Sequence, residues 1–138
     1  MELTHIEHIG IAVKDLQKAI DYYENVLGVH CYAIEEVKEQ KVKTAFFKVG
    51  QTKIELLEST DAEGPVGKFI EKKGEGVHHI AFAVQHIDKA LEEVESKGIR
   101  LIDKETRKGA EGLDIAFLHP KSTFGVLTEF CEKKAGKE

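Results

Sequence analysis

Cysteine, proline and tryptophan are all scarce in this sequence, which has two cysteines, two prolines and no tryptophan among 138 residues. Cys31 and Cys131 form neither a C-x-x-C motif nor a disulfide framework, which excludes the class of small disulfide-bonded proteins. We therefore expect reduced thiols and a cytoplasmic protein. The sequence also lacks a Ser/Pro-rich linker that would separate two independent domains.

Long apolar runs and an excess of basic residues are absent as well. No apolar stretch approaches the length of a membrane span, so we expect no association with a membrane. The first residues, Met1-Glu2-Leu3-Thr4-His5, have neither the basic start nor the apolar run of a signal peptide. Lysine and arginine number 20 against 25 acidic residues, and the net charge of −5 argues against nucleic acid as a partner.

The most informative feature that the chain does contain is an internal repeat. The run His-Ile-Gly-Ile-Ala-Val at 8–13 returns, 71 positions later, as His-Ile-Ala-Phe-Ala-Val at 79–84. Each copy precedes the start of an amphipathic helix, and residues 6–20 align with 77–91 at that offset. Such self-similarity indicates one supersecondary unit that is present twice. We therefore predict a single domain, 1–138, built from two modules.

Hydrophobic periodicity gives both modules the same order of elements. Apolar residues at helical spacing after Asp15 predict a helix that ends at Gly28, and a second helix is predicted from Ile87 to Lys97. Alternation and runs of β-branched and aromatic residues predict the strands. The predicted strands lie at about 6–13, 29–37, 42–49 and 52–58 in the first module, and at about 77–84, 99–105, 113–118 and 125–131 in the second.

A connector at about 59–76 joins module one, about 4–58, to module two, about 77–131. It contains Gly64-Pro65 and a short predicted helix from Val66 to Lys72. Both modules are thus β-α-β-β-β. The predicted fold class is α+β, with the two modules forming a curved mixed sheet around a central metal cleft.

Small residues accompany both repeated histidines. His8 shares its predicted strand face with Gly10 and Ala12, and His79 shares its face with two alanines. A well-packed core would place bulky side chains at these positions. The small neighbours instead leave space in front of the imidazoles, as a ligand site requires.

Each module also ends in a strand with one acid among apolar residues, Glu55 in the first and Glu129 in the second. A carboxylate in such a place is costly unless it is paired or binds a metal. We therefore predict one shared divalent metal site with His8, Glu55, His79 and Glu129 as ligands. Two nitrogen and two oxygen ligands suit Co²⁺, Ni²⁺, Mn²⁺, Zn²⁺ or Fe²⁺. An octahedral ion would keep two open positions for a chelating substrate, which suits proton abstraction next to a carbonyl.

Each of these residues also has a simpler interpretation. A single histidine on a strand face is more often a hydrogen-bonded core residue, and an acid in a strand often lies on a solvated face. It is the symmetric set that favours a metal. Two further residues stay open: His119, in the run His119-Pro120-Lys121, belongs either to a turn or to a substrate-facing loop, and Cys131 either packs or approaches the metal.

Three stretches together resemble the vicinal-oxygen-chelate superfamily, and within it the methylmalonyl-CoA epimerases. They are Glu-His-Ile-Gly-Ile-Ala-Val at 7–13, Gly-Val-His-His-Ile-Ala at 76–81, and Phe-Leu-His-Pro-Lys at 117–121 continuing through Gly-Val-Leu to Glu129. The resemblance covers about 4–131, almost the whole chain. It implies the glyoxalase-like fold, which is built from paired β-α-β-β-β modules.

The resemblance also implies a reaction and a set of roles. His8, His79 and Glu129 match the family's metal-ligand positions, and Glu55 matches the fourth. The implied reaction interconverts the (R) and (S) forms of methylmalonyl-CoA by proton abstraction at C2 through a metal-stabilised enolate, with Glu129 and Glu55 as the acid/base pair. Co²⁺ is the favoured ion, and a homodimer is expected. The chain departs from one epimerase at Thr44, where that enzyme has a glutamate proposed as an acid/base.

Other functions share this fold. A glyoxalase I (lactoylglutathione lyase)-type isomerase would use the same ligands and enolate chemistry. A non-enzymatic small-molecule-binding module would need no metal, so the complete ligand set counts against it. A ring-cleaving dioxygenase commonly has more modules and three ligands. The quoted motifs favour the epimerase.

Overall fold

The structure is a computed structural model that describes residues 1–133; residues 134–138 of the predicted domain lie outside the described part. The chain divides into two compact units. The N-terminal unit is His8–His78, and the C-terminal unit combines Met1–Glu7 with the chain from His79 onward. Two strands, β1 (Leu3–Ala12) and β5 (Gly76–Val84), therefore each contribute residues to both units.

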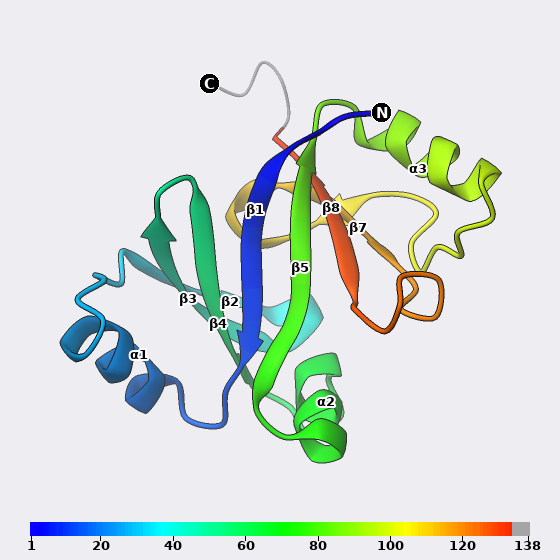
Figure 1. Ribbon diagram of the computed structural model, residues 1–138. Coiled ribbons are helices and arrows are strands. Elements are labelled where there is room, and N and C mark those ends of the chain that lie inside the picture. The colour runs from blue at the N-terminus through cyan, green and yellow to red at the C-terminus, as the bar shows by residue number, and fades with distance from the viewer. Residues whose placement is uncertain (134–138) are drawn as a thin grey trace. The chain divides into compact units, whose positions relative to one another are not determined.

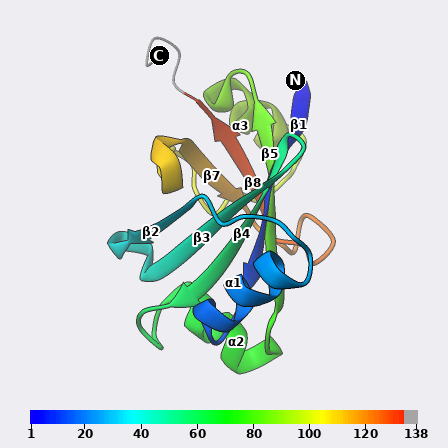
Figure 2. The ribbon, with the colours of Figure 1, turned by 90° about the vertical axis from the view of Figure 1, so that its left-hand side faces the viewer.

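The N-terminal unit has one helix before its remaining strands and one after them. Its strands follow the order β2-β3-β4-β1, with β1 parallel to β4 and the other pairs antiparallel, and Figure 2 shows β2, β3 and β4 as neighbours. A two-residue turn, Gly50-Gln51, joins β3 to β4. The elements after β1 are α1 (Leu16–Asn25), β2 (Ala33–Val37), a 3₁₀ turn (Lys38–Gln40), β3 (Val42–Val49), β4 (Thr52–Ser59) and α2 (Pro65–Lys73).

The C-terminal unit repeats this plan. Its strands follow the order β5-β8-β7-β6, with β5 parallel to β8 and the other pairs antiparallel. Figure 1 shows β5, β8 and β7 as neighbours. The elements after β5 are α3 (Ile87–Ser96), β6 (Arg107–Lys108), a 3₁₀ turn (Ala110–Gly112), β7 (Asp114–Leu118) and β8 (Thr128–Glu132). The predicted α+β class with two β-α-β-β-β modules is confirmed. Within residues 1–133, no helix has the length and apolarity that crossing a bilayer requires.

In each unit a helix covers one face of the strands. Leu16 and Ile20 of α1 pack on Phe47 and other apolar residues of β3 and β4. The corresponding residues of α3 pack against Ala116, Leu118 and Phe130 in the C-terminal unit. Burying one such side chain stabilises the fold by roughly 1.5–3 kcal/mol. Because strand side chains alternate, the opposite face is left to the predicted site residues.

In each unit, a glutamate from the last strand accepts a hydrogen bond from the first residue of the helix that follows the first strand, α1 or α3. The Leu16 amide donates to Glu58 Oε2 at 3.5 Å, and the Ile87 amide donates to Glu132 Oε1 at 2.8 Å. A carboxylate there satisfies an orphan amide and complements the helix dipole. Both glutamates lie three residues after a predicted site acid, in the runs Glu-Leu-Leu-Glu and Glu-Phe-Cys-Glu.

The strand predicted near 99–105 is wrong. Only Leu101 forms an isolated bridge, to Leu118, and β6 begins later, at Arg107. The Asp103 side chain accepts the Phe117 amide at 2.9 Å, so a carboxylate replaces the backbone partner that a strand would have supplied. This is the competition that aspartate side chains offer to a sheet ladder.

Two other predicted strands are shorter than expected. Of the strand predicted at 29–37, only Ala33–Val37 forms, because the chain first folds back on α1, where the Cys31 amide donates to Glu24 Oε2 at 2.9 Å. The strand predicted at 125–131 begins at Thr128 instead. Phe124 and Gly125 have left-handed φ angles of 60° and 87°, which no strand accommodates.

Candidate metal and catalytic site

His8 and Glu55 lie together in the N-terminal unit. Strand β1 runs parallel to β4 with Gly10 opposite Glu55. His8 precedes Gly10 by two residues on β1, and its side chain extends toward β4. His8 Nδ1 lies 3.3 Å from Glu55 Oε2. Each residue is only 4% exposed. The register of one strand pair thus places a predicted imidazole and a predicted carboxylate side by side.

His79 and Glu129 lie together in the C-terminal unit in the same way. Strand β5 runs parallel to β8 with Ala81 opposite Glu129, and His79 Nε2 lies 3.1 Å from Glu129 Oε1. Both residues are buried. The Phe117 ring meets the His79 ring edge-on, with centroids 5.6 Å apart. This contact fixes the plane of the imidazole beside the carboxylate.

The small residues beside the histidines have a specific role in this register. Gly10 and Ala81 are the residues directly opposite the two site glutamates, and both are buried. Cross-strand neighbours on one face lie close enough for their side chains to touch. A bulky residue at either position would fill the space through which the histidine reaches the carboxylate. The small residues do lie beside the predicted site residues in each unit, and the ligand space that they are expected to leave stays a prediction.

The donor chemistry of the two pairs fits a divalent metal ion. Each pair presents an imidazole nitrogen and a carboxylate oxygen about as close as two ligands of one ion would lie. All four residues are buried, where an acid is costly without a cation or a donor beside it. The structure therefore brings His8 together with Glu55, and His79 together with Glu129. The sequence predicts one ion shared by all four residues, and that stays a prediction.

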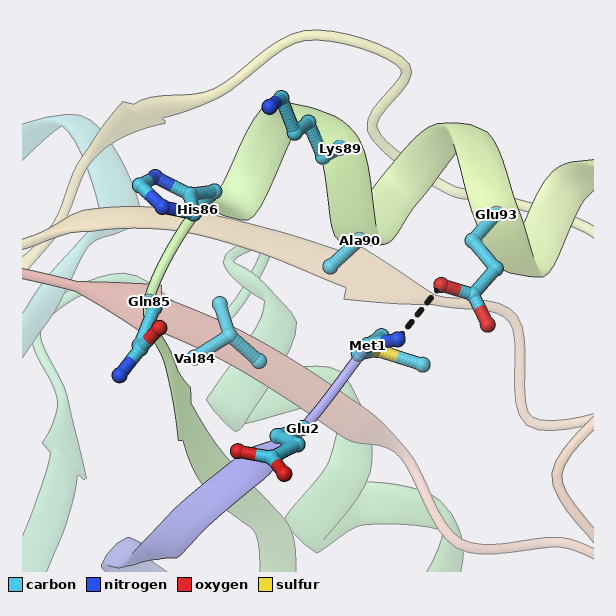
Figure 3. A pocket seen from close by; sticks show the side chains of 8 residues that line it. All are labelled: Met1, Glu2, Val84, Gln85, His86, Lys89, Ala90 and Glu93. Carbon is cyan, nitrogen blue, oxygen red and sulfur yellow. Dashed lines mark ion pairs between the residues drawn. The ribbon is translucent and has the colours of Figure 1, made fainter.

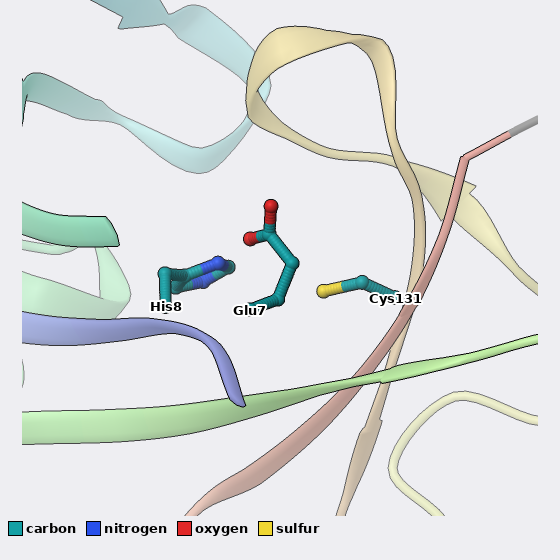
Figure 4. Close-up of side chains that lie close together, drawn as sticks. All are labelled: Glu7, His8 and Cys131. Carbon is teal, nitrogen blue, oxygen red and sulfur yellow. The ribbon is translucent and has the colours of Figure 1, made fainter. Parts of the chain in front are cut away.

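Two residues near Glu129 add to the site beyond the prediction. The Cys131 thiol donates a hydrogen bond to Glu129 Oε2 at 3.2 Å, and both side chains are buried. Glu7, only 8% exposed, has a carboxylate oxygen within 4.8 Å of the same sulfur (Figure 4). The sequence leaves the role of Cys131 open and does not point to Glu7, because nothing in it separates Glu7 from acids on solvated faces.

Thr44 shares the strand face of Glu55. Phe46 of β3 lies opposite Glu55, so Thr44, two residues earlier, points to the same side and lies opposite Leu57. Its exposure is 1%. A hydroxyl cannot act as a base near neutral pH, so at this place the face offers a neutral group where one epimerase has a glutamate.

The run at His119 forms a turn. The Lys121 amide donates to His119 Nδ1 at 3.1 Å, and the Ser122 amide donates to the His119 carbonyl at 2.9 Å. Partial burial, together with the positive charges of Arg100 and Lys121, lowers the pKa of His119 below its ordinary value. The turn interpretation is confirmed, and a substrate-facing role stays a prediction.

A separate hollow of about 370 Å³ lies in the C-terminal unit, between the start of β1 and α3 (Figure 3). The amino group of Met1 pairs with Glu93 across it at 2.9 Å. The hydrogen bonds from this amino group and from Lys97 lower the pKa of Glu93. The residues that line the hollow include none of the predicted site residues.

Comparison with known proteins identifies the family. Residues 7–117 match the glyoxalase/bleomycin resistance protein/dioxygenase superfamily. The chain is 38% identical to the human mitochondrial methylmalonyl-CoA epimerase, over 92% of this chain and 73% of that protein. It is 36% identical to the ethylmalonyl-CoA/methylmalonyl-CoA epimerase of Cereibacter sphaeroides, over 92% and 96%.

A solved structure shows the same fold. A variant of the Streptomyces coelicolor methylmalonyl-CoA epimerase, in complex with 2-nitronate-propionyl-CoA, superposes with a TM-score of 0.93 at 40% identity and covers 97% of each chain. The predicted glyoxalase-like fold is therefore confirmed. The chain belongs to the glyoxalase/bleomycin resistance protein/dioxygenase superfamily and, within it, to the family of the methylmalonyl-CoA epimerases.

Proposed function

We propose that this chain interconverts the (R) and (S) forms of methylmalonyl-CoA in a metal-dependent reaction. Membership of the family makes it an isomerase of the epimerase class. The observation that carries the metal-dependent proposal is the buried histidine–glutamate pair that each unit forms from equivalent strands. Acids placed this way suit proton transfer at a carbon next to a carbonyl.

We propose that His8, Glu55, His79 and Glu129 together hold one divalent ion. The support is chemical: two imidazoles and two carboxylates are the ligands that borderline divalent ions accept, and each pair already has a ligand-like separation. When bound, the ion would supply positive charge that stabilises negative charge developing on the oxygens of the substrate.

The two glutamates are the proposed acid/base pair. The C2 hydrogen lies between a thioester and a carboxylate, so its removal leaves an enolate. Epimerisation then requires that one group removes the proton from one face of C2 and another returns a proton to the opposite face. We assign these two roles to Glu129 and Glu55, because they come from equivalent strands of the two units. Thr44, although it shares the strand face of Glu55, is not an acid at neutral pH.

Three finer predictions belong to this proposal. We favour Co²⁺ as the ion, with Ni²⁺, Mn²⁺, Zn²⁺ and Fe²⁺ as alternatives, because all of them accept this ligand set. We expect a homodimer, since exposed sheet edges are commonly covered by pairing. We place the protein in the cytoplasm, where its two cysteines would stay reduced.

The test is hydrogen exchange at C2 of methylmalonyl-CoA in deuterated water. Purified protein should incorporate deuterium at C2 from either epimer. A chelator should stop the exchange, and added Co²⁺ should restore it. Full exchange after metal analysis has shown that the ion is gone would contradict metal dependence but leave the epimerase activity standing.

Two further substrates separate the alternatives. Activity on ethylmalonyl-CoA shows whether the site accepts an ethyl group in place of the methyl group at C2. The hemithioacetal of methylglyoxal and glutathione tests a glyoxalase I-type reaction. Turnover of the hemithioacetal, without exchange on either acyl-CoA, would replace the proposed function with that alternative. Failure of all three substrates with metal-loaded protein would favour a binding module.

A further inference from the structure

We infer that Cys131 is a positioning residue for Glu129: its thiol holds one carboxylate oxygen so that the other stays directed at His79. The inference rests on the proposed function, because it gives Glu129 a reason to be held precisely. It assigns Cys131 no contact with the substrate.

The contacts of Glu129 divide between its two oxygens. Oε1 lies 3.1 Å from His79 Nε2, and Oε2 accepts the Cys131 thiol at 3.2 Å. A glutamate has three side-chain torsions, and fixing both oxygens removes the rotation that would exchange them. The thiol and the carboxylate come from the same strand, two residues apart, so the strand itself sets their separation.

Burial makes this hydrogen bond matter. Cys131 is 1% exposed and Glu129 is 3% exposed, so water does not readily replace the thiol as a donor. A hydrogen bond to a buried ionised group is stronger than one at the surface. Glu7 also has a carboxylate oxygen within 4.8 Å of the sulfur (Figure 4). The thiol donates a hydrogen bond to Glu129 Oε2, which lies 3.2 Å from the sulfur.

The other unit provides an internal comparison. Cys131 lies two residues after Glu129, and the residue two after Glu55 is Leu57, whose side chain has no hydrogen to donate. Leu57 packs instead with Ala12, Val42 and Val66. Cys131 also packs with apolar neighbours, among them Ala81 and Ile115. A packing role is therefore the alternative that the experiment must separate from a positioning role.

Three substitutions separate the hydrogen bond from the volume. Cys131→Ser keeps a donor at similar size, Cys131→Val keeps the volume without a donor, and Cys131→Ala removes both. Cys31→Ala is the matched control, because Cys31 is the chain's other cysteine and donates to the Ala33 carbonyl at 3.4 Å. The readouts are kcat and KM for methylmalonyl-CoA, and metal affinity by competition with a chelator.

The expected pattern follows the donor. Cys131→Ser and the control should stay within about twofold of wild type, while Cys131→Val and Cys131→Ala should each lose about tenfold in kcat with KM little changed, the usual worth of one such hydrogen bond. Metal affinity should fall in the same two variants. If Cys131→Val has the kcat and the metal affinity of wild type, the inference is overturned.

Failure of the proposed function is distinguishable from this result. A wild type that binds metal but exchanges no C2 hydrogen would refute the epimerase, and the chelator competition would still measure whether the thiol affects the site. If Cys131→Ala unfolds, Cys131→Ser and Cys131→Val still decide the question between them.

Discussion

The two units of this chain share a backbone plan but surround their site glutamates differently. In both units a small residue lies opposite the site glutamate, and the histidine two residues before that small residue lies beside the glutamate. A second glutamate, three residues after the site glutamate, accepts a hydrogen bond from the first residue of the helix. In the C-terminal unit the Cys131 thiol also donates to the glutamate, whereas the matching residue of the N-terminal unit is Leu57, which has no donor. What the repeat shares is thus the geometry that delivers the side chains, and what differs is the chemistry around the carboxylate.

The histidines differ as well. The N-terminal unit turns Nδ1 of His8 toward Glu55, and the C-terminal unit turns Nε2 of His79 toward Glu129. The turns before the last strands differ too: Gly50-Gln51 in one unit and the longer segment 119–127 in the other. The two units therefore differ in the imidazole nitrogen that faces the glutamate and in the length of the turn before the last strand.

The largest expected effect is on metal affinity, and it shows whether the two histidines contribute equally to it. His8→Ala and His79→Ala should each lower metal affinity by more than roughly 10²-fold, since losing a ligand costs more than losing its hydrogen-bond partner. Metal analysis measures the loss, and circular dichroism checks that each variant stays folded. Equal metal content in wild type and both variants would place the metal elsewhere, and loss in only one would break the symmetry.

The second-largest expected effect concerns the two glutamates, each of which is proposed to transfer a proton on one face of the substrate. Glu129→Gln should slow proton removal chiefly from one epimer, and Glu55→Gln from the other, each by roughly 10²–10⁴-fold, the worth of a general acid or base. Exchange is measured from each epimer separately, with metal content as the control. Near-wild-type exchange from both epimers in Glu55→Gln would remove Glu55 from the mechanism and point to a loop residue or bound water.

A smaller effect concerns the second glutamate of each unit. Glu132→Ala should destabilise the protein by about 1 kcal/mol, and Glu58→Ala by less, because the Glu132 hydrogen bond is the shorter one and His86, the residue before α3, makes no capping hydrogen bond of its own. Urea unfolding measures both, and Glu92→Ala, on the exposed side of α3, is the control. A larger loss in Glu58→Ala would reverse the comparison.

The smallest effect concerns the turn that only the C-terminal unit has. Because partial burial, Arg100 and Lys121 lower the pKa of His119, its folded-state pKa lies below the unfolded value. His119 therefore adds stability above the unfolded pKa, and this stability is lost as the pH falls through the folded pKa. An NMR titration should show the low pKa, and Arg100→Gln should raise it. An unchanged pKa in Arg100→Gln would remove that charge as a cause.

The sequence predicts the site pairs well because a repeat makes local patterns comparable. Strand alternation around His8 and His79 gives their faces, and an acid among apolar residues in the last strand of each module gives Glu55 and Glu129. Both are local patterns, and each occurs once in each module, so that the two copies support one another.

What the sequence does not show depends on contacts between distant residues. The strand predicted near 99–105 does not form where the Asp103 side chain accepts a hydrogen bond from the Phe117 amide. Hydrophobic periodicity does not predict that contact. Glu58 and Glu132 meet helix amides more than forty positions away in sequence. Their three-residue spacing from Glu55 and Glu129 is visible in the sequence, but its use becomes clear only when strand and helix are placed.

The division of β1 between the two units has a consequence for the order of events during synthesis. Met1–Glu7 are made before the unit His8–His78, yet they belong to a unit whose other residues start at His79. The unit His8–His78, in contrast, is one continuous stretch of the chain. The first seven residues must wait for a chain segment made much later, and closing so long a loop slows that step. Met1–Glu7 are therefore among the last of the described residues to find their partners.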